Sequence, residues 1–142
     1  MSNLQELIKN NTLNNRLSSF LDKYGISGLE AALTTYESMQ QTYTVKTKNT
    51  ISRIHISDIN YIIIDGHHMK IFSSNNVYEK YGSLAQEMKE LSAYDFIKCS
   101  QNCIVSMNKI KRIDQNNIIL YDDTIIHMTR KYAPPILAKF LT

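Results

Sequence analysis

The first forty residues carry apolar side chains three or four positions apart, the spacing of one face of an α-helix. These apolar residues are Leu4, Leu7, Ile8, Leu13, Leu17, Phe20 and Leu21. Gly25 and Gly28 interrupt the pattern, and a second helix is predicted from Leu29 to about Met39. Two short amphipathic helices cannot bury their apolar faces alone. We therefore expect residues 1–41 to form a helical arm that packs on the rest of the chain, on a second copy or on another protein.

From Thr42 onward apolar and polar residues alternate, as expected for β-strands. Predicted strands cover residues 43–45, 54–56, 59–64, 69–72, 77–80, 96–99 and 125–128, with further strands between residues 104 and 120. The run Ile59–Ile64 is almost wholly apolar, which favours a strand covered on both faces. Turn signals separate the strands at Asp65-Gly66, Asn75-Asn76, Gln115-Asn116-Asn117 and Asp122-Asp123. This half of the chain is predicted to be mainly antiparallel β-structure.

Two short helices are predicted among these strands. Ser83 can cap the first, with Gln86 at capping-box spacing, and Leu84, Met88 and Leu91 would line one face. The second is predicted from Pro134 to Leu141, because proline is tolerated in a first helical turn. The expected organisation is a helical arm, residues 1–41, and a mainly β domain, residues 42–142, with one inserted helix and a C-terminal helix.

The positive charge lies in the second part of the chain. Residues 1–44 carry three basic and four acidic side chains, and the remainder carries thirteen basic and nine acidic ones. We therefore expect a polyanion to dock on the β domain. Hydrophobic residues make up 43% of the chain, enough for a folded core.

Cys99 and Cys103 do not follow a zinc-ligand pattern, and we expect two buried free thiols in a reducing cytoplasm. A metal site built from His67, His68, His127 and the cysteines has no ligand spacing behind it, so no metal and no cofactor are expected. The sequence shows no leader-like N-terminus and no apolar run of bilayer length. No nucleophile triad, HExxH or phosphate-binding loop is present, and we predict a cytoplasmic protein that is not an enzyme.

Polar side chains between strands, followed by a basic pair, indicate nucleic-acid binding. Ser100, Gln101 and Asn102 separate two apolar strands, and a later strand ends at Arg130 and Lys131. Side chains that donate and accept hydrogen bonds can read base edges, and basic ones can hold phosphates. The tyrosines at 43, 61, 78 and 121 could offer a base-stacking platform, but their alternation with polar residues favours packing positions.

Residues from about Thr44 to Leu141 resemble the LytTR family of bacterial DNA-binding domains. The resemblance lies in an ordered series of blocks: "ISDINYI" with a following turn and histidine, "YGSLAQEMKEL", "FIKCSQNCIVSMNKIKRI", and a hairpin that ends in "TRKY". It implies an elongated domain of stacked small antiparallel sheets, in which turns and strand ends enter successive major grooves of DNA.

The resemblance also suggests which residues bind DNA. The implied DNA-binding residues are His67, His68, Lys98, Ser100, Gln101, Asn102, Arg130 and Lys131. Lys98 would lie near a phosphate. The family often has His-Arg-Ser or His-Asn-Ser where this chain has Ser-Gln-Asn, so we expect a different base preference. Pro134-Pro135 interrupts the helix that follows the arginine in the family, and the first forty residues do not match its common receiver domain.

The predicted function is therefore a sequence-specific regulator of transcription that binds double-stranded DNA, as two copies on repeated half-sites. A second hypothesis gives the main role to the arm. In that case the β domain would be a protein-interaction module, and the arm would bind a regulatory protein such as a membrane-embedded inhibitor.

Overall fold

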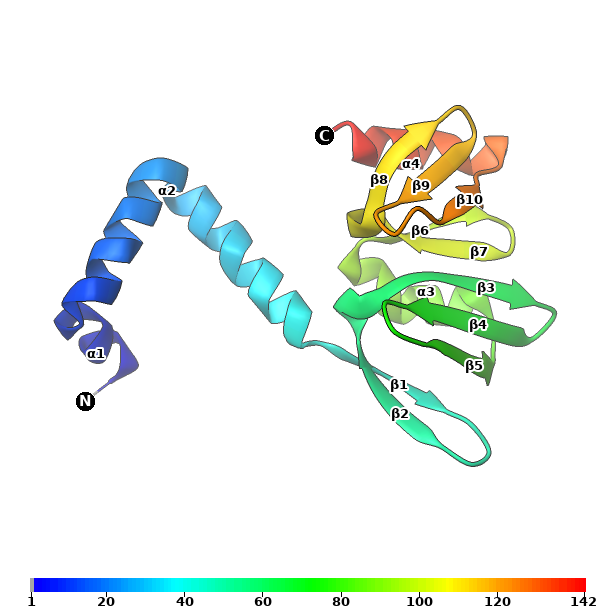
Figure 1. Cartoon of the computed structure of the whole chain (residues 1–142), viewed down its shortest axis with the longest axis horizontal. Helices are drawn as coiled ribbons and strands as arrows, with labels where there is room; N and C mark the ends of the chain where they lie inside the picture. The colour runs from blue at the N-terminus through cyan, green and yellow to red at the C-terminus, as the bar shows by residue number, and fades with distance from the viewer. Residues whose placement is uncertain (1) are drawn as a thin grey trace. The chain divides into compact units, whose positions relative to one another are not determined.

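The computed structural model describes residues 2–142, and the chain divides into two compact units, residues 1–39 and 40–142 (Figure 1). Each unit is described by itself. No helix in the described part of the chain is long and apolar enough to cross a membrane.

The first unit is entirely helical. It holds α1 (Asn3–Lys9) and α2 (Asn11–Gln40), whose last residue belongs to the second unit. Ser2 caps α1, and the Asn10 side chain accepts a hydrogen bond from the Leu13 amide at the start of α2. Neither helix contains a buried residue.

Gly25 breaks α2, as the sequence predicts, with φ of 73° and ψ of −176°. Only glycine adopts that conformation readily. The prediction that Gly28 also interrupts the helix is wrong, because the chain is helical again after Gly25. Gly28 lies against the preceding turn, where an added Cβ would come within 2.5 Å of Tyr24 Cβ. It is therefore a small residue at a close approach inside a helix.

The second unit is mainly β, as expected. Its strands are β1 (Thr42–Lys46), β2 (Ile51–His55), β3 (Ile59–Asp65), β4 (His68–Ser73), β5 (Val77–Tyr81), β6 (Phe96–Ser100), β7 (Cys103–Ser106), β8 (Ile110–Asp114), β9 (Asn117–Leu120) and β10 (Ile125–His127). They form three antiparallel sheets, in the orders β1-β2, β5-β4-β3-β7-β6 and β10-β9-β8 (Figure 1).

The helical segments of this unit lie between strands or, for the last two along the chain, after the final strand. They are the 3₁₀ turns η1 (Ile56–Asp58), η2 (Ser92–Tyr94), η3 (Met107–Lys109) and η4 (Arg130–Tyr132), and the helices α3 (Leu84–Leu91) and α4 (Ala133–Phe140). The Ser83 hydroxyl caps α3 by accepting from the Gln86 amide. The double proline lies in the first turn of α4, directly after η4, and does not interrupt the helix.

Two hydrophobic cores meet at the five-stranded sheet. One contains Ile62, Met69 and Ile104 together with residues of β1 and α3. The other contains Cys103 and Val105 together with residues of the three-stranded sheet and α4. Because successive strand residues point to opposite faces, β7 contributes to both cores, and all four of its residues are buried.

The expectation that Ile59–Ile64 is covered on both faces is wrong at the end of the strand. Ile59 and Ile62 are fully buried, but Ile63 is 39% exposed and Ile64 is only partly buried. The strand extends past its cover toward the turn at Asp65-Gly66. Gly66, with φ of 65°, gives that turn the backbone conformation it needs.

Candidate nucleic-acid interface

Backbone hydrogen bonds hold three chain segments at one end of the five-stranded sheet. The Ile64 amide donates to the Asn102 carbonyl at 2.9 Å, which ties β3 to the turn between β6 and β7. The Thr129 amide donates to the Cys99 carbonyl at 2.9 Å, which ties the segment before η4 to β6. The β3–β4 turn, the β6–β7 turn and η4 therefore lie together, at the right of the domain in Figure 1. We call this group of segments the loop edge.

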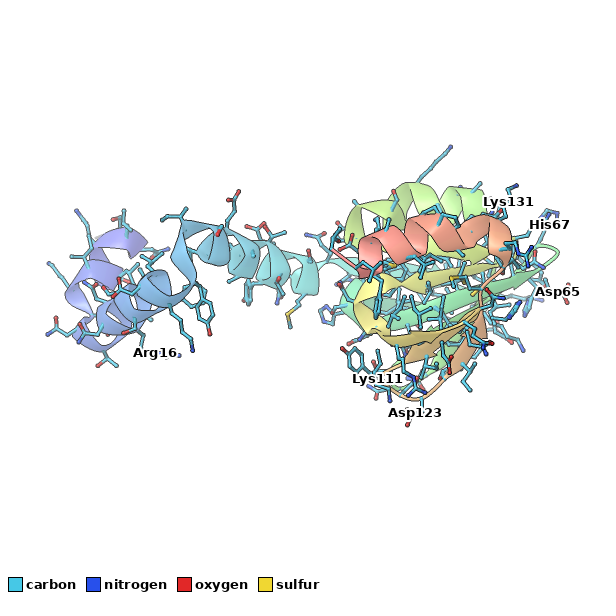
Figure 2. The ribbon with its side chains drawn as sticks, turned by 90° about the horizontal axis from the view of Figure 1, so that it is seen from above. Arg16, Asp65, His67, Lys111, Asp123 and Lys131 are labelled. Atoms are coloured by element: carbon cyan, nitrogen blue, oxygen red, sulfur yellow. The ribbon has the colours of Figure 1, made fainter. Side chains whose placement is uncertain are left out.

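His67 is exposed in the β3–β4 turn, where its carbonyl accepts from the Gly82 amide at 2.8 Å. Figure 2 shows its side chain at the loop edge, beside Asp65. His68 belongs to β4 and points toward β5: its Nε2 lies 3.5 Å from Glu79 Oε1, and its ring meets Tyr81 edge-on at 5.4 Å. Of the two histidines, only His67 is in the turn.

The β6–β7 turn has a defined shape. Ser100 ends β6, and its hydroxyl accepts a hydrogen bond from the Asn102 amide at 3.3 Å. The pairing of β6 with β7 is irregular between Lys98 and Ser100. Gln101 and Asn102 are exposed at the tip. Their amide groups can both donate and accept hydrogen bonds, as base-edge contacts require.

The third segment contributes positive charge. Arg130 and Lys131 are exposed in η4, and Lys98 is half-buried on β6. Both lysines lie over the ring of Tyr132: the Lys98 Nζ is 5.4 Å and the Lys131 Nζ 5.6 Å from its centroid. None of these three basic residues takes part in an ion pair among residues 2–142.

Two thiols lie beneath the β6–β7 turn. Cys99 and Cys103 are both free and buried, as predicted. The Cys99 thiol donates to the Cys103 carbonyl at 3.6 Å. The hydrogen bond with Cys99, together with burial, raises the pKa of the Cys103 thiol. Cys103, buried among apolar side chains of the second core, is therefore a packing residue.

Other candidates lie elsewhere. His127 is exposed on β10, and no group of His, Cys, Asp and Glu side chains within residues 2–142 is arranged to hold a metal. Lys111 pairs with Asp123 at 2.6 Å, away from His67 and Lys131 in Figure 2. The prediction that Tyr121 packs like a core residue is wrong. It follows β9 in a turn and is 67% exposed, whereas Tyr43 is buried.

Sequence reasoning missed two residues that organise the charged groups. The ammonium groups of Lys98 and Lys131 both lie over the ring of Tyr132. The sequence feature that could have indicated this role is the position of Tyr132 directly after Arg130-Lys131. Glu87, which the sequence analysis did not single out, is buried on the same face of α3 as Leu84 and Leu91. A carboxylate inside an apolar stripe indicates a buried basic partner, which here is Lys80 at 2.9 Å.

Comparisons with a family model and with solved structures both match this chain to the LytTr DNA-binding domain. Residues 49–140 match the family model described as the LytTr DNA-binding domain. A solved structure from Bacillus cereus, the LytTr DNA-binding domain of a methyl-accepting/DNA response regulator, is 21% identical, with a TM-score of 0.58. That match covers 72% of this chain and 97% of the other, and at this identity it shows a shared fold. No curated protein matches the chain significantly in sequence.

Proposed function

Because the chain belongs to the LytTR family of DNA-binding domains, we propose that it regulates transcription by reading duplex DNA with the turns of the loop edge. The family is one of DNA-binding domains and not of enzymes. The supporting observation is the convergence of the three segments: two backbone hydrogen bonds of 2.9 Å join the turns that carry His67, Gln101 and Arg130. A read-out built on turns needs such support, since a loose loop would lose binding energy on ordering.

The residues at or beside the loop edge divide into three groups by chemistry. Arg130 can donate two parallel hydrogen bonds to a guanine, and Gln101 or Asn102 can pair with an adenine, both in the major groove. His67 would read a neighbouring base from the β3–β4 turn. Ser100 shapes its turn, and His68 supports the adjacent strand through Glu79. Lys98 and Lys131 would contact phosphates, which position the protein without selecting a sequence.

The test is a selection from random duplexes with the purified full chain, repeated at two salt concentrations. We expect a repeated sequence element, since two copies on half-sites would enrich a repeat, and an affinity that falls steeply with salt. Enrichment of no sequence, together with an affinity indifferent to salt, would contradict the proposal.

Arg130→Ala tests the reading role directly. It should cost about 1–3 kcal/mol of discrimination between the selected duplex and one altered at the contacted base pair. Arg112→Ala is the matched control, because Arg112 is an exposed arginine on β8 of the three-stranded sheet. Unchanged discrimination by Arg130→Ala at fixed salt would remove Arg130 from the reading set.

We propose further that the helical arm joins two copies of the chain. No residue of α1 or α2 is buried within the unit, and Ile26, Leu33 and Tyr36 are each more than half exposed. Isolated helices shorter than about 15 residues are only marginally stable in water, and most helical stability in proteins comes from packing of an apolar face. A second copy would cover the face and would match binding to repeated half-sites.

Leu33→Gln should therefore lower the fraction of dimer in sedimentation experiments, whereas Thr34→Gln, an exposed neighbour on α2, should not. A full chain that stays monomeric at all concentrations would instead favour the second hypothesis, in which the arm binds a different regulatory protein.

A further inference from the structure

Tyr132 places the side chains of two lysines from different segments beside one aromatic ring. Lys98 comes from β6 and Lys131 from η4, and their Nζ atoms lie 5.4 and 5.6 Å from the ring centroid. An ammonium within about 6 Å of a ring is attracted by the negative charge of its face. The ring thereby restrains two long, otherwise flexible side chains.

The backbone brings these groups together. The Thr129 amide donates to the Cys99 carbonyl at 2.9 Å, so the segment before η4 runs beside the end of β6. The Tyr132 amide then donates to the Thr129 carbonyl at 3.0 Å and closes the 3₁₀ turn. As a result the half-buried Tyr132 ring reaches both Lys98 and Lys131.

The charge of this cluster is not neutralised within the protein. Neither lysine lies within 4 Å of a carboxylate in the described part of the chain. Two ammonium groups near one ring repel each other, and an anion beside them relieves that repulsion. Arg130 and the β6–β7 turn lie next to the cluster along the chain, so an anion bound here would adjoin the reading residues.

We propose that Tyr132, Lys98 and Lys131 form a phosphodiester-binding site, in which Tyr132 is the positioning residue that aims both lysines at the DNA backbone. This inference rests on the proposed function, since it assigns part of the DNA contact to a residue outside the reading set. Lysine suits the task because its compact charge neutralises a phosphate without demanding a particular base.

The site makes a specific prediction about salt. Each phosphate contact adds about 0.9 to the slope of the logarithm of affinity against the logarithm of salt concentration. Lys98→Gln should lower the steepness by about 0.9, and the double variant K98Q/K131Q by roughly twice as much. The preference for the selected duplex over an unrelated one should stay unchanged in these variants, because phosphates carry no sequence information.

The decisive variant is Tyr132→Leu, measured on the full chain with a 30-base-pair duplex of random sequence. We expect binding about fivefold weaker and a shallower salt dependence. Tyr132→Phe should behave as the natural protein does, because it keeps the ring. In the Tyr132→Leu background, Lys98→Gln should cost less than in the natural protein, since ring and lysine act together.

Matched controls lie at the other end of β7. Lys109 is in η3, and the Tyr121 amide donates to its carbonyl at 3.0 Å. Lys109→Gln and Tyr121→Leu repeat the chemical changes away from the loop edge and should leave the salt dependence unaltered. Thermal unfolding of each variant shows whether an effect is a loss of fold, which Tyr132→Phe and the lysine variants avoid.

Three outcomes distinguish a failure of this inference from a failure of the proposed function. If the natural protein binds duplex DNA with a steep salt dependence and Tyr132→Leu keeps that slope, the phosphate site is wrong and the function stands. If the costs of Tyr132→Leu and Lys98→Gln simply add, Tyr132 does not position the lysine. If the natural protein binds no duplex at all, the proposed function fails and this inference fails with it.

Discussion

A lysine lies over a tyrosine in two regions of the β domain, and the two contacts differ in their electrostatic surroundings. Lys80 on β5 lies 5.1 Å from the ring centroid of Tyr43, and it also pairs with Glu87 Oε1 at 2.9 Å. The Tyr43 hydroxyl donates to Glu87 Oε2 and accepts from Lys80 Nζ at 3.3 Å. Lys98 lies over the ring of Tyr132 in the same way, but in the described part of the chain no carboxylate pairs with it.

The presence of one carboxylate distinguishes the two contacts: the lysine is neutralised at the first and, among the described residues, keeps an unbalanced charge at the second. Glu87 extends to the first site from α3 and is only 7% exposed, so the charge of Lys80 is neutralised inside the domain. Together with the Tyr43 hydrogen bond, this ion pair also links α3 to β1 and β5. At the loop edge, none of the helical segments within residues 2–142 offers an acidic side chain within ion-pair distance of Lys98. The same residue pair therefore stabilises the fold in one region and remains able to attract an external anion in the other.

Removing the carboxylate should produce the largest effect. Glu87→Gln leaves Lys80, only 20% exposed, without its counter-charge. We expect a loss of about 3 kcal/mol in the free energy of unfolding, measured by urea denaturation. Glu79→Gln is the control, because Glu79 is 56% exposed and its loss should matter little. If both changes lower the stability equally and only slightly, the ion pair between Lys80 and Glu87 does not stabilise the fold as argued.

The tyrosine hydroxyl should matter only at the closed site. Tyr43→Phe removes a buried hydrogen bond to Glu87 and should cost about 1–2 kcal/mol of stability, whereas Tyr132→Phe should cost nothing measurable. Burial, followed by the hydrogen bond and the charge of Glu87, raises the pKa of Tyr43. The unfolded chain therefore loses this proton first, and the contribution of Tyr43 to stability should fall as the pH rises above about 10.

That decline at alkaline pH can be followed by urea denaturation at a series of pH values. It should be smaller in Tyr43→Phe, which has no phenol to ionise at this position. A decline of the same size in both proteins would assign the alkaline effect to other groups.

An acidic side chain added to the loop edge should partly neutralise the positive charge there, as Glu87 neutralises Lys80. Gln101→Glu places a carboxylate at the tip of the β6–β7 turn and should weaken binding to random duplexes by about 1 kcal/mol at low salt. The loss should shrink at high salt, because mobile ions screen exposed charges. Asn108→Asp repeats the change of charge at the other end of β7, in η3, and should have little effect. Equal losses in both variants would indicate a response to net charge alone.

The smallest effect is expected at an ion pair exposed to solvent. The Lys111 ammonium lies 2.6 Å from Asp123 Oδ1 and, through that hydrogen bond and its charge, lowers the pKa of the carboxyl. The contribution of a lowered carboxyl pKa is present above its ordinary value of about 3.9 and disappears as the pH falls through the lowered one. Lys111→Gln should therefore lower Tm only slightly at neutral pH, with no difference left at strongly acidic pH. A large decrease in Tm at pH 7 would contradict the expectation that exposed ion pairs contribute less to stability than buried ones.

The sequence predicts much of the local structure, because local rules determine it. Alternating apolar residues place the strands, Gly66 adopts the positive φ that its turn requires, and Ser83 caps α3. The resemblance to the family implied a domain of small antiparallel sheets, and the fold agrees. The roles of the individual residues at that site remain predictions.

Features set by distant parts of the chain could not be predicted in this way. The burial of Glu87 depends on Lys80, from the preceding strand, and on Tyr43, which is far from it in sequence and meets it only in the folded domain. Likewise, Tyr132 reaches Lys98 through a backbone bond between two segments. Ile63 is exposed because β3 extends beyond the elements that cover it, which the apolar sequence around Ile63 does not show.

The position of β7 between the two cores has a consequence for how this protein can change. A slip of one residue against β6 or β3 would turn Ile104 toward the second core and Cys103 and Val105 toward the first, so both cores oppose it. The same slip would move Gln101 and Asn102, which directly precede the strand. Under the proposed function, interior substitutions near β7 would therefore change the preferred duplex without altering any of the proposed reading residues.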